Sequence, residues 1–205
     1  MQRFLDIDFR SFWDGFWEGV GRPKIAILAA YKPLSSFEWA NDLLKLKWSD
    51  DVKKIIVSQI ENSIKEKTLR SEIPHLNIID DKISQIVRKQ YEENPYPRWI
   101  NPGLSCKPRS IREVLNSNNI HHHLDEQNLS DKPDVLVAGC GTGRQALYAA
   151  SQYLNSNVLA IDLSLNSLAY AMRKTKELGI KNIEYIQGDI LKLNKLEKQF
   201  DIIES

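Results

Sequence analysis

The chain has 205 residues, of which 42% are apolar and 27% charged, and its formal net charge is +1. This composition is typical of a globular protein and excludes fibrous and extensively disordered chains. The near-neutral charge excludes a global basic field that would attract nucleic acid or anionic membranes. No apolar run is long enough to span a bilayer, and two cysteines, Cys106 and Cys140, are too few for a disulfide framework. We therefore expect a cytoplasmic protein.

Residues 1–130 are predicted to be mainly helical. An aromatic stripe at positions 12, 13, 16 and 17 is interpreted as facing a core or a partner. Ser49 is expected to cap a helix with apolar residues at three- and four-residue spacing. Asp80 or Asp81 is expected to start another helix, which carries Ile83, Ile86, Val87 and Tyr91 on one face and ends before Pro95. Further short helices are predicted over residues 24–31, 37–48 and 110–115.

From residue 134 the pattern changes to alternating strands and helices, which predicts an α/β fold with a Rossmann-like parallel sheet. Strands are expected over residues 135–138, 158–161, 183–186 and 200–204, and helices over residues 144–154 and 165–178. Gly179 is expected to close the second helix in the left-handed conformation. We accordingly divide the chain into a mainly helical N-terminal region, 1–130, and an incomplete Rossmann-like domain, 131–205.

The first strand runs directly into three glycines at alternate positions, in the stretch D-V-L-V-A-G-C-G-T-G at residues 134–143. Gly139, Gly141 and Gly143 lack a Cβ, so the backbone can turn sharply at the carboxyl end of the strand. The N–H groups of the turn and of the next helix can then face an anionic or nucleotide-like ligand. This loop is predicted to cradle a cofactor.

Two acidic residues follow the next two strands at the same predicted edge of the sheet. Asp162, 19 residues after Gly143, is placed to accept both ribose hydroxyls of an adenosine. Asp189, after Gly188, is placed to accept from an exocyclic amine such as that of adenine. A dinucleotide site is the rival interpretation: the pattern G-x-G-x-x-G fails at Arg144, but residues 141–146 match its looser form with alanine.

The tighter G-x-G-x-G spacing and the two acidic residues resemble class I S-adenosylmethionine-dependent methyltransferases. The flanks Q-Y-E-E-N-P-Y-P-R-W at 90–99, A-I-D-L-S-L-N-S-L-A-Y-A at 160–171, R-K-T-K-E-L-G-I at 173–180 and F-D-I-I-E-S at 200–205 are similar to the methyltransferase domain of bacterial tetratricopeptide-repeat methyltransferases. The resemblance implies a glycine loop at the methionine end of the cofactor, Asp162 at the ribose and Asp189 at the adenine. The cofactor-binding residues expected on this basis are Gly139, Cys140, Gly141, Thr142, Gly143, Asp162, Leu163, Gly188, Asp189, Ile190 and Glu204.

The sequence departs from the broad class at two places. Val137 stands where many class I enzymes carry an acidic residue that holds the cofactor's ammonium group, and Glu204 is the candidate to replace it by position. Class I sheets normally have seven strands, but four are predicted here, so we expect a truncated domain whose fourth strand leaves an open edge. We expect the isolated chain to be inactive or poorly folded unless a partner or a missing segment covers that edge. A cofactor- or partner-binding remnant without chemistry is the alternative.

The segment from Tyr91 to Trp99 has two interpretations. It folds over the cofactor, with Arg98 pairing with the cofactor's carboxylate, or it is a proline-stiffened connector that packs its aromatic rings against the sheet domain. The run His121 to His123 is interpreted as a solvated loop, because adjacent side chains diverge and no ligand set is completed. We expect direct methyl transfer to an unidentified acceptor, which depends mainly on alignment of the reactants. No catalytic base is assigned.

Overall fold

The structure is a computed structural model that describes residues 21–93, 95–104, 107–117 and 129–205. The predicted aromatic stripe at residues 12–17, Cys106 and His121 to His123 lie outside the described residues. The chain divides into two units, residues 1–65 and 66–205. This division falls elsewhere than the predicted domain boundary near residue 130, because segments between residues 66 and 117 hydrogen-bond to the sheet domain.

In the first unit the described residues form short helices: α2 (Gly21–Tyr31), the 3-10 turn η3 (Leu34–Ser36), α3 (Ala40–Leu43), α4 (Asp50–Ile56) and the π-helical segment η4 (Val57–Glu61). The helix predicted over residues 37–48 is reduced to the four residues of α3. Val52, Ile56 and Ile60 are buried in the core of this unit. Gln59 joins two elements, because its Nε2 donates to the Ala29 carbonyl at 2.9 Å and its Oε1 accepts from the Leu34 N–H at 3.0 Å.

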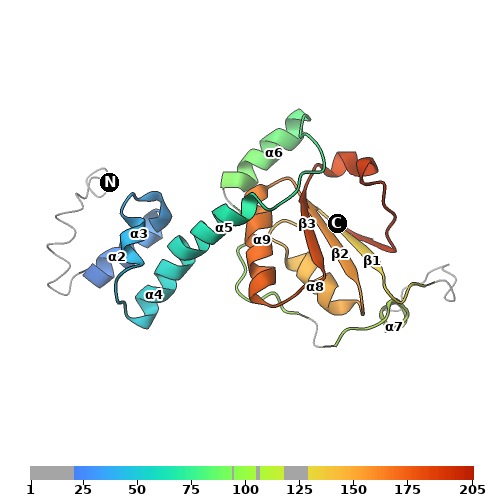
Figure 1. The fold of residues 1–205 in the computed structure, drawn as a ribbon, viewed down its shortest axis with the longest axis horizontal. Coiled ribbons are helices and arrows are strands. Elements are labelled where there is room, and N and C mark those ends of the chain that lie inside the picture. Colours follow the sequence, from blue (N-terminus) through green and yellow to red (C-terminus); the bar gives the residue numbers. More distant parts are fainter. Residues whose placement is uncertain (1–20, 94, 105–106, 118–128) are drawn as a thin grey trace. The chain divides into compact units, whose positions relative to one another are not determined.

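The second unit contains a four-stranded parallel sheet in the order β3-β2-β1-β4 (Figure 1). Its strands are β1 (Asp134–Ala138), β2 (Asn157–Asp162), β3 (Ile183–Gln187) and β4 (Ile202–Glu204). Among the described strands β4 pairs with β1 alone, so it is an edge of the sheet. The α/β class and the parallel sheet predicted from the sequence are confirmed.

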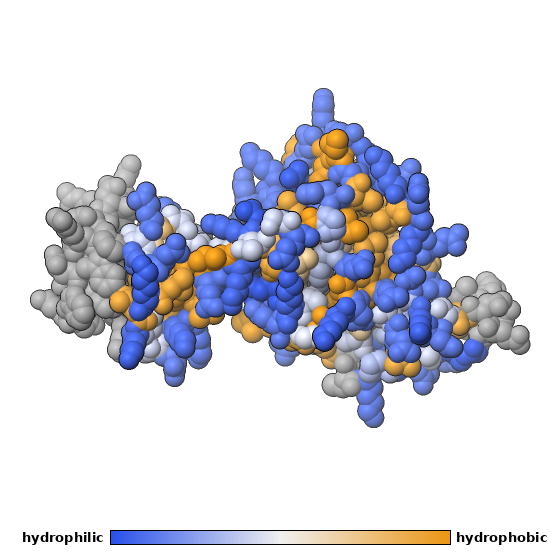
Figure 2. Space-filling view, viewed as in Figure 1, coloured by the Kyte–Doolittle hydropathy of each residue, from blue (hydrophilic) through white to orange (hydrophobic). Residues whose placement is uncertain are grey.

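Both faces of the sheet are covered, which explains the nearly continuous apolar strand sequences. Val135 and Val137 point to the face packed by α8 (Arg144–Gln152) and α9 (Leu165–Glu177). Leu136 and Ala138 point to the other face, which is covered by partly buried apolar residues of η6 (Ile190–Leu196) and its flanks. Figure 2 shows apolar atoms reaching the surface over the strands.

The helices that precede the sheet in this unit are α5 (Asn62–Arg70), which begins before the unit boundary, α6 (Lys82–Glu93) and α7 (Ile111–Ser117). A carboxylate at the end of α6 fixes this helix beside the start of α9: Glu92 accepts from the N–H groups of Leu165 at 2.7 Å and Asn166 at 3.1 Å. Such a carboxylate complements the positive end of the helix dipole. The apolar face predicted for α6 is solvent-exposed at Ile83 and Ile86 (72% and 70% exposed).

In the part of the chain that the structure covers, no helix is both long and apolar enough to cross a membrane.

Candidate functional site

The glycine turn after β1 adopts the conformation that its sequence predicts. Gly139, Gly141 and Gly143 all have positive φ, at 75°, 53° and 82°. The turn is held against β2, because the N–H groups of Gly139 and Cys140 both donate to the Ile161 carbonyl, at 2.8 and 2.9 Å. The turn is therefore rigidly attached to the carboxyl edge of the sheet.

Two of the three glycines serve different purposes. A Cβ on Gly143 would lie 2.5 Å from the Ala171 Cβ, so this glycine lets α8 begin in close contact with α9. A Cβ on Gly139 would meet no protein atom within 4 Å, so the space beside this glycine is open. The close packing requirement belongs to Gly143, whereas Gly139 leaves room for a ligand.

Asp162, the last residue of β2, faces this turn. Its Oδ2 accepts from the Gly141 N–H at 2.8 Å and its Oδ1 accepts from the Ser164 N–H at 2.9 Å. Burial raises the pKa of the carboxyl above its usual value of 3.8, although the backbone N–H donors of Ser164 and Gly141 oppose this shift. Each carboxylate oxygen has a second lone pair, so Asp162 can still accept hydrogen bonds from a ligand.

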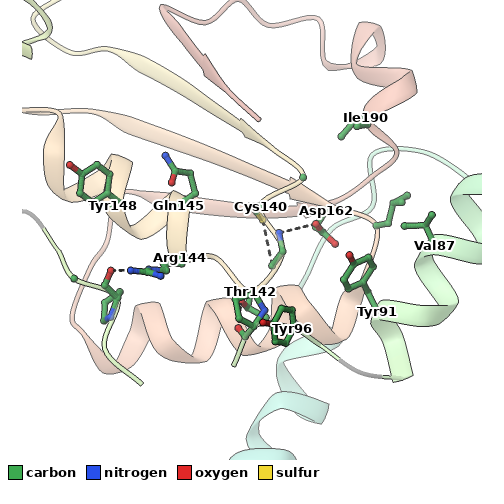
Figure 3. Close-up of a pocket in the computed structure, with 16 residues that line it drawn as sticks. Val87, Tyr91, Tyr96, Cys140, Thr142, Arg144, Gln145, Tyr148, Asp162 and Ile190 are labelled. Atoms are coloured by element: carbon green, nitrogen blue, oxygen red, sulfur yellow. Dashed lines mark hydrogen bonds between the residues drawn. The ribbon is translucent and has the colours of Figure 1, made fainter. Parts of the chain in front are cut away.

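A cavity of about 740 Å³ opens along the turn and Asp162 (Figure 3). It is lined by Val87, Tyr91, Tyr96, Pro97, Pro102, Gly103, Gly139, Cys140, Gly141, Thr142, Arg144, Gln145, Tyr148, Asp162, Leu163 and Ile190. Its volume is in the range of small-molecule and cofactor sites, and most of its walls are apolar or aromatic. Asp162 is the one carboxylate and Arg144 the one cation among these lining residues.

The structure brings seven of the eleven predicted site residues into the wall of this cavity. They are Gly139, Cys140, Gly141, Thr142, Asp162, Leu163 and Ile190. Gly143, Gly188, Asp189 and Glu204 are not among the lining residues. Cys140 is a buried free thiol whose pKa burial raises well above its usual value, so it has the character of a small packed residue rather than of a nucleophile.

Asp189 lies directly before η6 and is fully buried. Its Oδ1 accepts from the Leu191 N–H at 3.0 Å. Its Oδ2 is buried and has no hydrogen-bond partner among the described residues. A buried carboxylate oxygen without a donor is costly, so this atom still requires a donor, although Asp189 itself does not line the cavity.

Glu204, at the end of β4, is occupied by protein donors. Its carboxylate accepts from Gln145 Nε2 at 2.5 Å and from the Tyr153 hydroxyl at 3.3 Å. Burial, followed by the charge of Glu204, raises the pKa of Tyr153 to about 12. The assignment of Glu204 to the cofactor's ammonium group stays a prediction, and Gln145 connects it to the cavity wall.

The segment from Tyr96 to Trp99 combines both predicted interpretations. Tyr96 and Pro97 line the cavity, but Arg98 does not. Arg98 instead pairs with Glu66 at 3.8 Å and lies over the Tyr170 ring. Trp99 is buried and packs edge-on against Tyr170. Arg98, the predicted partner of the cofactor's carboxylate, is thus held away from the cavity by the buried carboxylate of Glu66.

Sequence reasoning missed Arg144, Gln145 and Tyr148 as cavity residues. The available signal was their place on the first turns of the helix after the glycine loop, where residues four apart lie on one face. Arg144 Nε donates to the Pro102 carbonyl at 3.3 Å, and no carboxylate of the described residues lies within ion-pair distance of it. Among the described residues, Arg144 is therefore a cation of the cavity wall without an ion-pair partner.

The comparisons with known proteins agree on one domain. Residues 135–205 match the family described as a methyltransferase domain. Over these residues the chain is therefore similar to class I S-adenosylmethionine-dependent methyltransferase domains. The match implies S-adenosyl-L-methionine as the cofactor of the domain, and the open space at Gly139 and the unpartnered oxygen of Asp189 suit such a ligand.

Three relatives illustrate the range of similarity. An N-methyltransferase 4 of Papaver somniferum is 33% identical over 76 residues, which cover 37% of this chain and 21% of the relative. A tRNA (guanine-N(7)-)-methyltransferase of Rubrobacter xylanophilus is 34% identical over 65 residues, 32% of this chain and 29% of the relative. The solved structure of PKMT2 from Rickettsia typhi with AdoHcy is 32% identical with a TM-score of 0.33, and covers 36% of this chain and 14% of that chain. This chain spans less than a third of the length of either curated relative.

Proposed function

We propose that this protein binds S-adenosylmethionine in the cavity beside the glycine turn and transfers its methyl group to an acceptor that is not identified. The observation that carries the proposal is that the open side of Gly139 and the carboxylate of Asp162 border one cavity. A glycine turn without this opening would be a structural element alone.

The proposed orientation of the cofactor follows from the chemistry of the cavity wall. Asp162 would accept from the ribose hydroxyls, and Leu163 and Ile190 would enclose the adenine. The unpartnered Oδ2 of Asp189 would accept from the adenine amine. The amino-acid part would then extend along Gly139 and Gly141 toward α8.

Arg144 replaces Arg98 as the proposed partner of the cofactor's carboxylate. It lines the cavity, whereas Arg98 is paired with Glu66. Arg144 also stands at the amino end of α8, where the helix dipole favours negative charge. Its guanidinium retains N–H donors beyond the one bonded to Pro102, and these can form a charge-assisted hydrogen bond.

The cofactor supplies a methyl group on a positively charged sulfur. In the transfer the sulfur–methyl bond breaks, a bond from the methyl carbon to the acceptor atom forms, and the proton that the acceptor loses goes to solvent or to the substrate's own basic group. The residues of this chain bind and orient the reactants, which is the main requirement of such a displacement. One relative is named for a guanine of tRNA and the other only for transfer to nitrogen, so we leave the acceptor open.

We also infer, from the residues at 90–99 and 160–180, that the chain is related to the tetratricopeptide-repeat methyltransferases. We further infer that the protein works in the cytoplasm, where the Cys140 thiol stays reduced. The unpaired side of β4 supports a further proposal, that a strand from a partner or from a longer form of the protein pairs with it.

Calorimetric titration with S-adenosylhomocysteine and with NAD tests the proposal. We expect the full chain to bind S-adenosylhomocysteine and not NAD, and Asp162→Asn to weaken binding at least about tenfold because an ionised acceptor is lost. Asp134→Asn is the control, since Asp134 lies at the opposite end of the sheet, at the start of β1. Binding of NAD alone would replace this proposal with a nicotinamide enzyme, and equal affinities of the two variants would remove Asp162 from the site.

A further inference from the structure

One stretch outside the glycine turn contributes four lining residues to the cavity. The segment Tyr96–Gly103, termed the strap, lines it at both ends, with Tyr96 and Pro97 at one end and Pro102 and Gly103 at the other. Its middle residue Trp99 does not line the cavity and is buried (8% exposed). The ends of the strap therefore line the cavity, while its middle residue Trp99 is buried in the protein.

Two hydrogen bonds join the strap to Thr142 of the glycine turn, which is the donor in one and the acceptor in the other. The Thr142 hydroxyl donates to the Pro97 carbonyl at 2.6 Å, and the Trp99 indole N–H donates to the Thr142 carbonyl at 3.1 Å. Thr142 and Trp99 are both buried, so the bond between them is shielded from water, whereas the bond to the exposed Pro97 is shielded only in part. The position of the strap is thereby fixed relative to the turn.

The back of the strap is fixed to α9. The Tyr170 hydroxyl donates to the Trp99 carbonyl, and the two rings pack edge-on with centroids 5.7 Å apart. Lys174 lies 5.3 Å from the centroid of the Trp99 ring. Trp99 thus contacts the glycine turn on one side and α9 on the other.

The strap borders one part of the cavity rather than the whole. The strap also contacts α8, because Arg144 Nε donates to the Pro102 carbonyl. The nucleoside end is lined instead by α6, through Val87 and Tyr91, together with Leu163 and Ile190. A change in the strap should consequently affect the two halves of a ligand unequally.

We infer that the strap forms the binding wall for the amino-acid part of the cofactor and that Trp99 is the positioning residue that holds it in place. This inference rests on the proposed function. Trp99 acts through the Thr142 carbonyl and the Tyr170 hydroxyl, not by touching the cofactor. Loss of its N–H should loosen the wall while the glycine turn, which is separately bonded to Ile161, remains in place.

The test compares Trp99→Phe with Trp48→Phe in the full chain. Trp48 donates its indole N–H to the Leu43 carbonyl at 2.7 Å in the first unit, so the control removes the same kind of bond at another place. The ligands are S-adenosylhomocysteine and 5′-methylthioadenosine, which keeps the nucleoside and the sulfur but lacks the amino-acid part. Affinities are measured by calorimetry, and folding by thermal denaturation.

We expect Trp99→Phe to weaken S-adenosylhomocysteine about fivefold, the factor that one net hydrogen bond is worth, and 5′-methylthioadenosine less than about twofold. Trp48→Phe should change neither affinity. An equal loss of affinity for both ligands, or no loss, would overturn this inference and leave the proposed function standing. If the wild-type chain binds no S-adenosylhomocysteine, the proposed function fails and this inference fails with it.

A second pair of variants decides the matter if Trp99→Phe does not fold. Tyr170→Phe removes the hydroxyl that holds the Trp99 carbonyl and keeps the ring. Tyr185→Phe is its control, because the buried Tyr185 hydroxyl bonds to Thr175 at 2.7 Å. The same selective loss for Tyr170→Phe supports the inference, and equal behaviour of the two tyrosine variants contradicts it.

Discussion

Replacing Gly139 by alanine separates the cost of backbone strain from the filling of the cofactor space. Gly139 and Gly179 have similar φ, 75° and 69°, and an added Cβ at either position would meet no protein atom within 4 Å. Gly179 follows α9, whereas Gly139 lines the cavity. The two variants are therefore matched in strain and differ in what the new methyl group faces.

The expected magnitudes follow from this match. A residue with a Cβ in the left-handed conformation costs about 1–2 kcal/mol, and restriction of the unfolded chain by alanine offsets part of this in both variants. A loss of about 1 kcal/mol lowers the Tm of a chain of this size by roughly 2–4 °C. In Gly139→Ala the methyl group also occupies space that we assign to the cofactor, so S-adenosylhomocysteine should bind at least about tenfold more weakly.

The assay combines thermal denaturation with calorimetric titration for both variants. We expect similar Tm values and a loss of affinity confined to Gly139→Ala. Equal affinity of the two variants for S-adenosylhomocysteine would refute the placement of the cofactor beside Gly139. A much lower Tm for Gly139→Ala alone would refute the claim that its surroundings are open.

Three further predictions concern charged groups. Glu66→Ala breaks a buried ion pair with Arg173 (2.9 Å; Glu66 8% and Arg173 7% exposed), but Arg173 keeps Glu177 as a partner, so the cost in urea denaturation should be about 2 kcal/mol. Glu72→Ala, which breaks an exposed pair of the same length with Lys176, should cost less than about 1 kcal/mol, and similar costs for the two variants would contradict the role of burial. Glu204→Gln should lower the pKa of Tyr153 from about 12 while burial keeps it above 10, and an unchanged value in an NMR titration would remove the electrostatic contact. Burial favours the protonated form of Asp162, so the contribution of this group to stability is present below pH 3.8 and is lost as the pH rises through its raised pKa. Ribose hydroxyls favour the ionised form, so the affinity for S-adenosylhomocysteine should increase over the same pH range. If the pH dependence of the affinity persists in Asp162→Asn, another group is responsible for it.

The sheet and the glycine turn could be predicted from local sequence because their signals are local. The strand before Gly139 is continuously apolar, which fits a strand covered on both faces, and the glycines stand where positive φ is required. Asp162 could be placed because the end of a parallel strand fixes the position of the next residue along the edge. The structure sets both beside one cavity.

The strap and the role of Arg98 could not be predicted in this way. Whether Arg98 faces a cofactor depends on Glu66, which is 32 residues earlier in the chain and becomes its neighbour only through the packing of α5. The exposure of Ile83 and Ile86 has a similar origin, since periodicity identifies an apolar face but not what lies against it. Such features depend on tertiary contacts between distant segments.

The most direct test of the central claim is a crystal structure of the chain with S-adenosylhomocysteine. We expect the ligand in the cavity, with its ribose hydroxyls on Asp162 and its adenine amine within hydrogen-bond distance of Asp189 Oδ2. A ligand bound elsewhere, or a ribose that does not contact Asp162, would contradict the claim that this cavity is the cofactor site.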